Sequence, residues 1–160
     1  MSGVEKLSSV AGPPTSLTPD ELLFQDAVPG FAEAGVRPRA AEMEKAGRLD
    51  PALIRGAFEL GLMGLEVDEQ YGGAGGSLMM VTLGVEAISR VDASAAIIVD
   101  VQNTLANYPI SRYGSDAQKS TYLAKLTTDT VGAYALSEPS SGSDAFGLQT
   151  YMGVPADGYY

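Results

Sequence analysis

The sequence has 160 residues, of which 45% are apolar and 19% charged; its formal net charge is −10, and it contains neither Cys nor His. This composition is typical of a folded domain and excludes disulfides, cysteine–zinc sites, imidazole ligands and the usual serine triads. The ten basic residues are scattered and none follows Lys125, whereas nucleic-acid binding needs a basic cluster. The longest apolar run, Ala95 to Val99, is far shorter than the ~20 residues that span a bilayer. We therefore expect no nucleic-acid partner and no membrane span.

The chain divides into three parts by composition. Residues 1–17 are rich in Ser, Gly and Pro, without an apolar signal region or an Arg-rich transit pattern, and we expect a disordered tail with no clear import signal. Residues 18–130 have helical patterns throughout. From residue 131 the pattern changes, and residues 131–160 are predicted to begin a β domain. The predicted fold class is mainly α, a helical domain followed by the first strands of an incomplete β domain.

Helix starts are well marked in the first half. Thr18-Pro19-Asp20-Glu21 is a capping box with proline at the first helical position, and Asp50-Pro51 repeats the N-cap and proline. Pro29 lies inside the first helical pattern, and its missing N–H predicts a bend or break near Val28. Gly61 is predicted to end the helix that follows Asp50.

The next stretch lacks a helical period. Residues 62–71 are predicted to be extended and to lead into the glycine cluster of residues 72–76. That cluster is neither GxGxxG nor a Walker loop, so we interpret it as a flexible connection rather than a phosphate loop.

Two apolar helices follow, at residues 78–91 and 93–106, and the second is apolar around most of its circumference, which predicts a central position. Its polar exceptions Gln102, Asn103 and Thr104 either face a ligand cavity or bridge other helices, and bridging is the commoner role of buried polar groups. Tyr108-Pro109 is predicted to break this helical pattern, and Ser115 to Gln118 form a second capping box.

The densest chemistry lies at Tyr134 to Asp144. An apolar run, Val131 to Leu136, is predicted to be a buried strand that opens into a loop rich in hydroxyls and backbone N–H groups, and Phe146 to Met152 is a predicted second strand. Such a loop can bind the polar edge of a flat heterocycle and a phosphate. The alternative is an ordinary strand-to-strand turn.

Taken together, these motifs resemble the flavin-dependent acyl-CoA dehydrogenases. The matching pieces, in order, are Leu60 to Leu65 with Tyr71-Gly72-Gly73, Val91 to Ser94, Gln102 to Leu105, Tyr113 to Ser115, Gln118-Lys119 with Tyr122-Leu123, and Tyr134 to Asp144. Within the family, Val91 to Thr104 and the turn Leu126-Thr127-Thr128 are most similar to the short/branched-chain members. The resemblance covers roughly residues 17–150.

The resemblance implies a cofactor, FAD, bound in the family between a middle β domain and a C-terminal helical domain. It implies that Ser143 touches acyl-CoA in addition to FAD. It also implies candidates for the wall of the acyl pocket, namely Gly84, Ile88, Gln102 and Leu105. It implies FAD contacts for Tyr134, Ala135, Leu136, Ser137, Glu138, Pro139, Ser140, Ser141, Gly142 and Ser143.

The implied activity is α,β-dehydrogenation of short or branched acyl-CoA thioesters. In the family a glutamate of the C-terminal domain removes the α proton while the β hydrogen leaves as hydride to the flavin. We expect this chain to lack that base and to be inactive alone, and we expect Glu138 to have a loop-capping or solvated role. The resemblance further implies an electron-transfer flavoprotein as partner, a homotetramer of the full-length relative and the mitochondrial matrix. The alternatives are an acyl-CoA oxidase-like flavoprotein and a non-catalytic helical interaction module.

Overall fold

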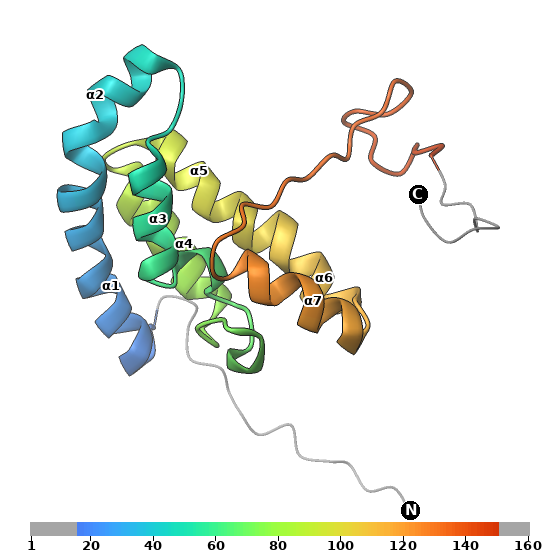
Figure 1. The fold of residues 1–160 in the computed structure, drawn as a ribbon, viewed down its shortest axis with the longest axis horizontal. Helices are drawn as coiled ribbons and strands as arrows, with labels where there is room; N and C mark the ends of the chain where they lie inside the picture. The colour runs from blue at the N-terminus through green and yellow to red at the C-terminus, as the bar shows by residue number, and fades with distance from the viewer. Residues whose placement is uncertain (1–15, 151–160) are drawn as a thin grey trace, which may run out of the picture.

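The structure, a computed structural model, describes residues 16–150 and is mainly helical, which confirms the predicted fold class. Figure 1 shows α1 and α2 along one side, α3, α4 and α5 in the middle, and α6 and α7 on the other side. None of the helices within residues 16–150 is long and apolar enough to cross a membrane. The elements are α1 (Pro19–Phe31), η1 (Ala32–Val36), α2 (Arg37–Ala46), α3 (Pro51–Glu59), η2 (Leu62–Gly64), η3 (Glu69–Tyr71), α4 (Leu78–Ser89), α5 (Ala93–Val101), η4 (Gln102–Asn107), α6 (Tyr108–Tyr113) and α7 (Asp116–Leu126).

The predicted helix starts are confirmed. The Thr18 side chain accepts a hydrogen bond from the Glu21 backbone, and the Glu21 carboxylate accepts one from the Thr18 N–H in return. Ser115 and Gln118 form the same reciprocal pair at the start of α7, and Asp50 and Asp92 cap α3 and α5. Each cap satisfies N–H groups that have no partner within the helix.

The predicted break near Val28 is wrong. Helix α1 continues through Pro29, and the deviation from α geometry lies downstream, where η1 is a π-helix that leads directly into α2. A π turn is a local widening that a helix can contain without ending. The helix is retained because its inner face, including Val28 and Val36, is buried in the core.

The predicted break at Tyr108-Pro109 is wrong for a similar reason. Helical structure runs without interruption from α5 through the π-helix η4 into α6, and Pro109 lies in the first turn of α6. This turn directly follows the π-helix η4, and a π turn is a local deviation that a continuous helix can contain without ending. Gly114 ends α6 in an extended conformation.

Residues 62–76 are more ordered than the sequence predicts. The segment expected to be extended contains the two 3₁₀ turns η2 and η3. The five N–H groups of residues 72–76 all donate to backbone carbonyls of residues 64–69, at 2.7–3.3 Å. The glycine cluster is therefore a pinned connection rather than a flexible one, and these N–H groups are not free to bind a phosphate.

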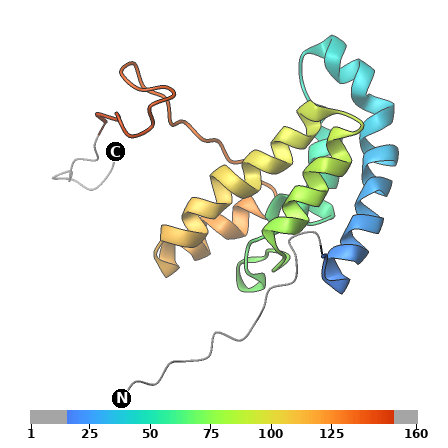
Figure 2. The ribbon, with the colours of Figure 1, turned by 180° about the vertical axis from the view of Figure 1, so that it is seen from behind.

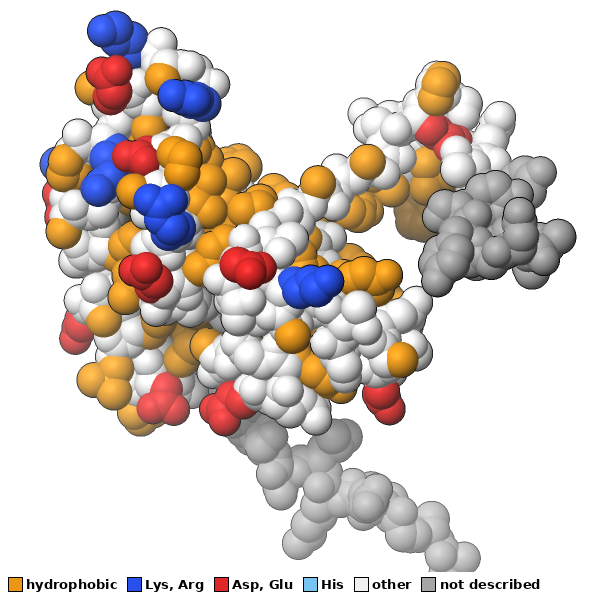
Figure 3. All heavy atoms as spheres, viewed as in Figure 1, with side chains coloured by type: hydrophobic (Ala, Val, Ile, Leu, Met, Phe, Trp, Pro, Cys, Tyr) orange, Lys and Arg blue, Asp and Glu red, His pale blue; other side chains and the backbone are white. Residues whose placement is uncertain are grey.

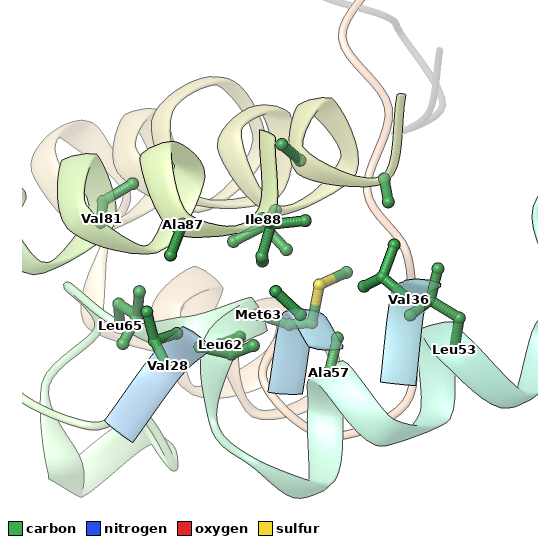
Figure 4. Close-up of a cluster of buried hydrophobic side chains, with 14 of the residues drawn as sticks. Val28, Val36, Leu53, Ala57, Leu62, Met63, Leu65, Val81, Ala87 and Ile88 are labelled. Atoms are coloured by element: carbon green, nitrogen blue, oxygen red, sulfur yellow. The ribbon is translucent and has the colours of Figure 1, made fainter. Parts of the chain in front are cut away.

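The core lies where α4 packs against α1 and α5, with α3 and η2 completing it. Figure 4 shows apolar side chains from these elements facing one another across the interior. Met63 and Val36 are fully buried, and Ile88 is 1% exposed. The labelled members are Val28, Val36, Leu53, Ala57, Leu62, Met63, Leu65, Val81, Ala87 and Ile88.

After α7 the chain leaves the helices as an arm, which we define as residues 131–150. Figures 1 and 2 show it extending away from the helical domain beyond α6 and α7. The predicted strand at Val131 to Leu136 is wrong: within residues 131–150 the β structure is a single isolated bridge between Glu138 and Ser141. A strand needs a neighbour to complete its hydrogen bonds, and the described residues supply none beside this run. The second predicted strand, Phe146 to Met152, is absent over residues 146–150, and its last two residues lie outside the described range.

Candidate functional site

The residues predicted to contact a cofactor lie together on the arm, as one continuous segment that we call the serine-rich segment (residues 134–143). Its apolar members are unusually exposed: Tyr134 is 47% exposed and Leu136 38%. Figure 3 shows apolar side chains along the arm where it leaves the helical domain. The segment is thus presented away from the core, without a wall of described residues opposite it.

A tight turn organises the middle of this segment. The N–H of Glu138 donates to the Ser141 carbonyl at 2.9 Å, and the N–H of Ser141 donates back at 3.0 Å. Ser141 is 4% exposed, and its hydroxyl donates to the Asp144 carbonyl. The Ser140 hydroxyl donates to the Glu138 carboxylate at 2.9 Å. Two of the four serines therefore hold the turn itself.

Glu138 closes the loop. Its carboxylate accepts hydrogen bonds from the Thr150 hydroxyl and from the N–H groups of Gln149 and Thr150. These donors, with the Thr150 hydroxyl foremost, lower the pKa of Glu138 to about 2. A carboxylate with so low a pKa and so many donors is a poor proton acceptor at neutral pH. The loop-capping role expected for Glu138 agrees with this geometry.

The remaining two serines are free to bind something else. The hydroxyls of Ser137 and Ser143 are exposed and make no hydrogen bond to another described residue, and neither do the N–H groups of Leu136 and Ser137. Unpaired donors beside an apolar side chain suit a flat heterocycle whose edge carries acceptor oxygens and nitrogens. In its chemistry, the segment therefore fits a ligand such as a flavin.

The buried amides of η4 are structural, the alternative that the sequence favoured. The Asn103 side chain accepts from the Leu65 N–H and donates to the Leu62 and Val99 carbonyls, each at 2.8 Å. The Gln102 side chain bonds backbone groups at the end of α7 and the start of the arm. Thr104 donates to the Asp100 carbonyl of its own helix at 2.8 Å. These groups are not available to a ligand.

Sequence reasoning did not single out Asn107 and Thr127 as tertiary contacts. The Asn107 amide donates to the Met63 carbonyl at 2.8 Å, and the Thr127 hydroxyl donates to the Tyr71 carbonyl at 3.2 Å. Their partners are 44 and 56 residues away in the chain, so no local pattern points to them.

The four candidates for an acyl-pocket wall lie in different environments. Ile88 is part of the core, and a Cβ on Gly84 would lie 3.6 Å from the Phe24 ring. The amide of Gln102 is paired as described above, whereas Leu105 is 38% exposed. A hollow of about 500 Å³ lies elsewhere, between the end of α2 and the start of α5; it is lined by Arg48 and Ser94 among others.

Comparison with known proteins identifies the family. The family model described as "Acyl-CoA dehydrogenase, N-terminal domain" matches residues 18–130. The chain belongs to the acyl-CoA dehydrogenase family. The resemblance seen in the sequence is thereby confirmed, and the mainly helical fold is that of the N-terminal domain of this family.

Similar proteins include members named for short and branched substrates. The chain is 41% identical over 155 residues to a probable short/branched chain specific acyl-CoA dehydrogenase of Dictyostelium discoideum, covering 97% of this chain and 38% of that protein. It is 39% identical over 152 residues to the mitochondrial short/branched chain specific enzyme of Bos taurus, covering 92% and 35%. Among solved structures it resembles an acyl-CoA dehydrogenase complexed with FAD from Bacillus anthracis, with a TM-score of 0.75, 32% identity and coverage of 84% and 23%. The chain therefore spans little more than a third of these curated relatives.

Proposed function

We propose that this chain is the N-terminal part of an FAD-dependent acyl-CoA dehydrogenase that acts on short or branched acyl-CoA thioesters. In this proposal residues 18–130 form the helical domain, and residues 131–160 begin the middle β domain. The observation that carries the proposal is the serine-rich segment, whose free hydroxyls and N–H groups follow directly on a helical domain of this family.

Each part of the segment has a proposed role at the flavin. The Ser137 hydroxyl, the N–H groups of Leu136 and Ser137 and the apolar Leu136 side chain would hold the flavin, while the Glu138 turn holds the loop in shape. Ser143 would contact both FAD and the acyl-CoA. Bound FAD supplies the hydride acceptor, and fixed donors at its edge favour the negative charge that reduction adds.

No described residue is assigned as the catalytic base. Glu138 is excluded by its donors and its low pKa. The family resemblance assigns the base to a C-terminal domain, so the proposed activity belongs to the whole protein, and residues 1–160 alone are proposed to be inactive.

The wider setting follows from relatives of the same kind. We propose an electron-transfer flavoprotein as the electron acceptor and a homotetramer as the full-length assembly. A mitochondrial location is proposed because the Bos taurus relative is named as mitochondrial.

The test is flavin retention. The product of the complete reading frame that carries this sequence should purify with FAD, one per chain, and residues 1–160 alone should retain none, because their segment lacks an opposing wall. In the complete product, Ser137→Ala should weaken FAD binding by about tenfold, the size of one lost hydrogen bond to a charged or developing anionic acceptor. Ser140→Ala is the matched control, since its hydroxyl is already bonded within the turn. A complete product without flavin, or equal effects of the two substitutions, would contradict the proposal.

A further inference from the structure

One buried side chain spans the junction between the helical domain and the arm. Gln102 is 1% exposed, and both polar atoms of its side-chain amide are hydrogen-bonded. Its Nε2 donates to the Leu126 carbonyl at 2.7 Å and to the Thr130 carbonyl at 3.0 Å, and its Oε1 accepts from the Gly132 N–H at 2.7 Å. The three partners are the last residue of α7, the end of the turn that follows it, and the start of the arm. A single amide in η4 thus fixes the path by which the chain leaves the helices.

Close packing restricts the same point. A Cβ on Gly132 would lie 2.4 Å from the Ala106 Cβ and 3.2 Å from the Leu126 side chain. Both Gln102 and Ala106 belong to η4, so this helix contacts the arm by a hydrogen bond and by direct backbone approach. Any larger residue at position 132 would push the arm off the helix.

Beyond this point the arm has no further polar tie to the helices. Every hydrogen bond of residues 133–150 to another described residue lies within the arm, among Glu138, Ser141, Asp144 and their neighbours. The Gln102–Gly132 bond is therefore the last hydrogen bond that connects the described arm to the helical domain. It lies two residues before Tyr134, where the serine-rich segment begins.

We propose that Gln102 is a positioning residue that fixes the direction in which the arm leaves the helical domain, and through it the placement of the serine-rich segment at the flavin. The role of the arm in cofactor binding rests on the proposed function, whereas the junction itself is a property of the described chain. This assigns to Gln102 a role different from that of an acyl-pocket wall.

The junction is tested on the 160-residue chain by amide hydrogen exchange. Gln102→Met keeps the side-chain volume and removes the three hydrogen bonds. Exchange of the Gly132 N–H should then accelerate on the order of tenfold to a hundredfold relative to amides of α4, the factor expected for losing one buried hydrogen bond. The matched control is Asn103→Leu, which removes an equally buried amide of the same helix whose partners lie in the core. Asn103→Leu should change the exchange rates of the Gly132 N–H and of the α4 amides by the same factor.

A second variant keeps the test decisive if Gln102→Met does not fold. Gly132→Ala leaves Gln102 intact but places a methyl group against Ala106, and it should expose residue 132 to fast exchange. Gly142→Ala, where a Cβ would meet nothing within 4 Å, should not. If exchange at residue 132 is unchanged relative to α4 in Gln102→Met, the junction is not held by Gln102 and the proposal fails. Where that variant does not fold, unchanged exchange in Gly132→Ala would show that the arm is not fixed against η4, and the proposal fails as well.

The link to the cofactor is tested separately in the complete product. There Gln102→Met should weaken FAD binding by about tenfold and alter the flavin absorbance spectrum, whereas Asn103→Leu should lower thermal stability and leave the spectrum of the bound flavin unchanged. Unchanged FAD affinity in Gln102→Met would overturn the positioning role. A complete product with no flavin at all would overturn the proposed function, and the exchange result at Gly132 would still decide the junction.

Discussion

Replacing Asn103 with Leu should destabilise the helical domain. Asn103 is 1% exposed, and its amide satisfies the Leu65 N–H and the Leu62 carbonyl, backbone groups 38 and 41 residues away. Leucine has the same number and branching of side-chain heavy atoms as asparagine, so the substitution creates no cavity. The substitution leaves these two buried backbone groups without partners, at about 1–3 kcal/mol each, which amounts to a loss of roughly 2–6 kcal/mol in the free energy of unfolding.

The loss is measurable because a domain of this size has only about 5–15 kcal/mol of stability in total. Urea denaturation of the 160-residue chain, followed by far-ultraviolet circular dichroism, gives the unfolding free energy of both proteins. Thr104→Val is the matched control: its hydroxyl bonds a carbonyl of its own helix, so its loss should cost less than about 1 kcal/mol. A change below about 1 kcal/mol for Asn103→Leu would refute the reasoning that this amide holds η2 and the segment after it against η4.

Three further predictions concern glycine packing and carboxylate protonation. Gly73→Ala should lower the unfolding free energy by about 1–3 kcal/mol or more, because its Cβ would lie 2.0 Å from the Val67 carbonyl oxygen. Gly30→Ala, in open space on α1, should raise the unfolding free energy by about 0.5–1 kcal/mol. Urea denaturation measures both variants, and equal effects would contradict the packing. The pKa of Glu138 is lowered to about 2, so the stabilisation of its turn should be complete above the ordinary value of 4.5 and be lost as the pH falls toward 2. An NMR titration of the Glu138 carboxyl carbon measures this pKa, and a midpoint near 4.5 would disprove the prediction. Burial raises the pKa of Glu66, so the unfolding free energy should increase as the pH falls through that raised pKa. For the same reason Glu66→Gln should stabilise the chain at neutral pH. Denaturation at two pH values tests both statements, and a loss of stability in the variant would contradict them.

Local capping chemistry made the helix starts predictable. Thr18, Asp50 and Ser115 form caps whose donors and acceptors lie within three residues, so the sequence contains the whole interaction. The breaks expected at Pro29 and Pro109 did not occur, because a local cost was weighed without the burial of the adjoining helical turns, which includes Val28 in α1 and Asn107 in η4. Propensity is a weak prior against such tertiary contacts.

The candidate site was predictable in composition but not in geometry. The serine-rich motif is visible in the sequence, yet which serines hold the turn and which are free depends on the Glu138–Ser141 bridge and on Asp144. The role of Gln102 depends on partners 24–30 residues further along the chain, which no periodicity reveals. Strand propensity at residues 131–136 was misleading because a strand also requires a neighbour.

The most direct test of the account is an anaerobic titration of the complete reading-frame product with a short branched acyl-CoA. If the serine-rich segment is part of a dehydrogenase flavin site, the purified protein contains FAD and the substrate bleaches its visible absorbance, with an electron-transfer flavoprotein restoring the oxidised spectrum. A protein without FAD, or a bound flavin that no short or branched acyl-CoA reduces, would contradict the account.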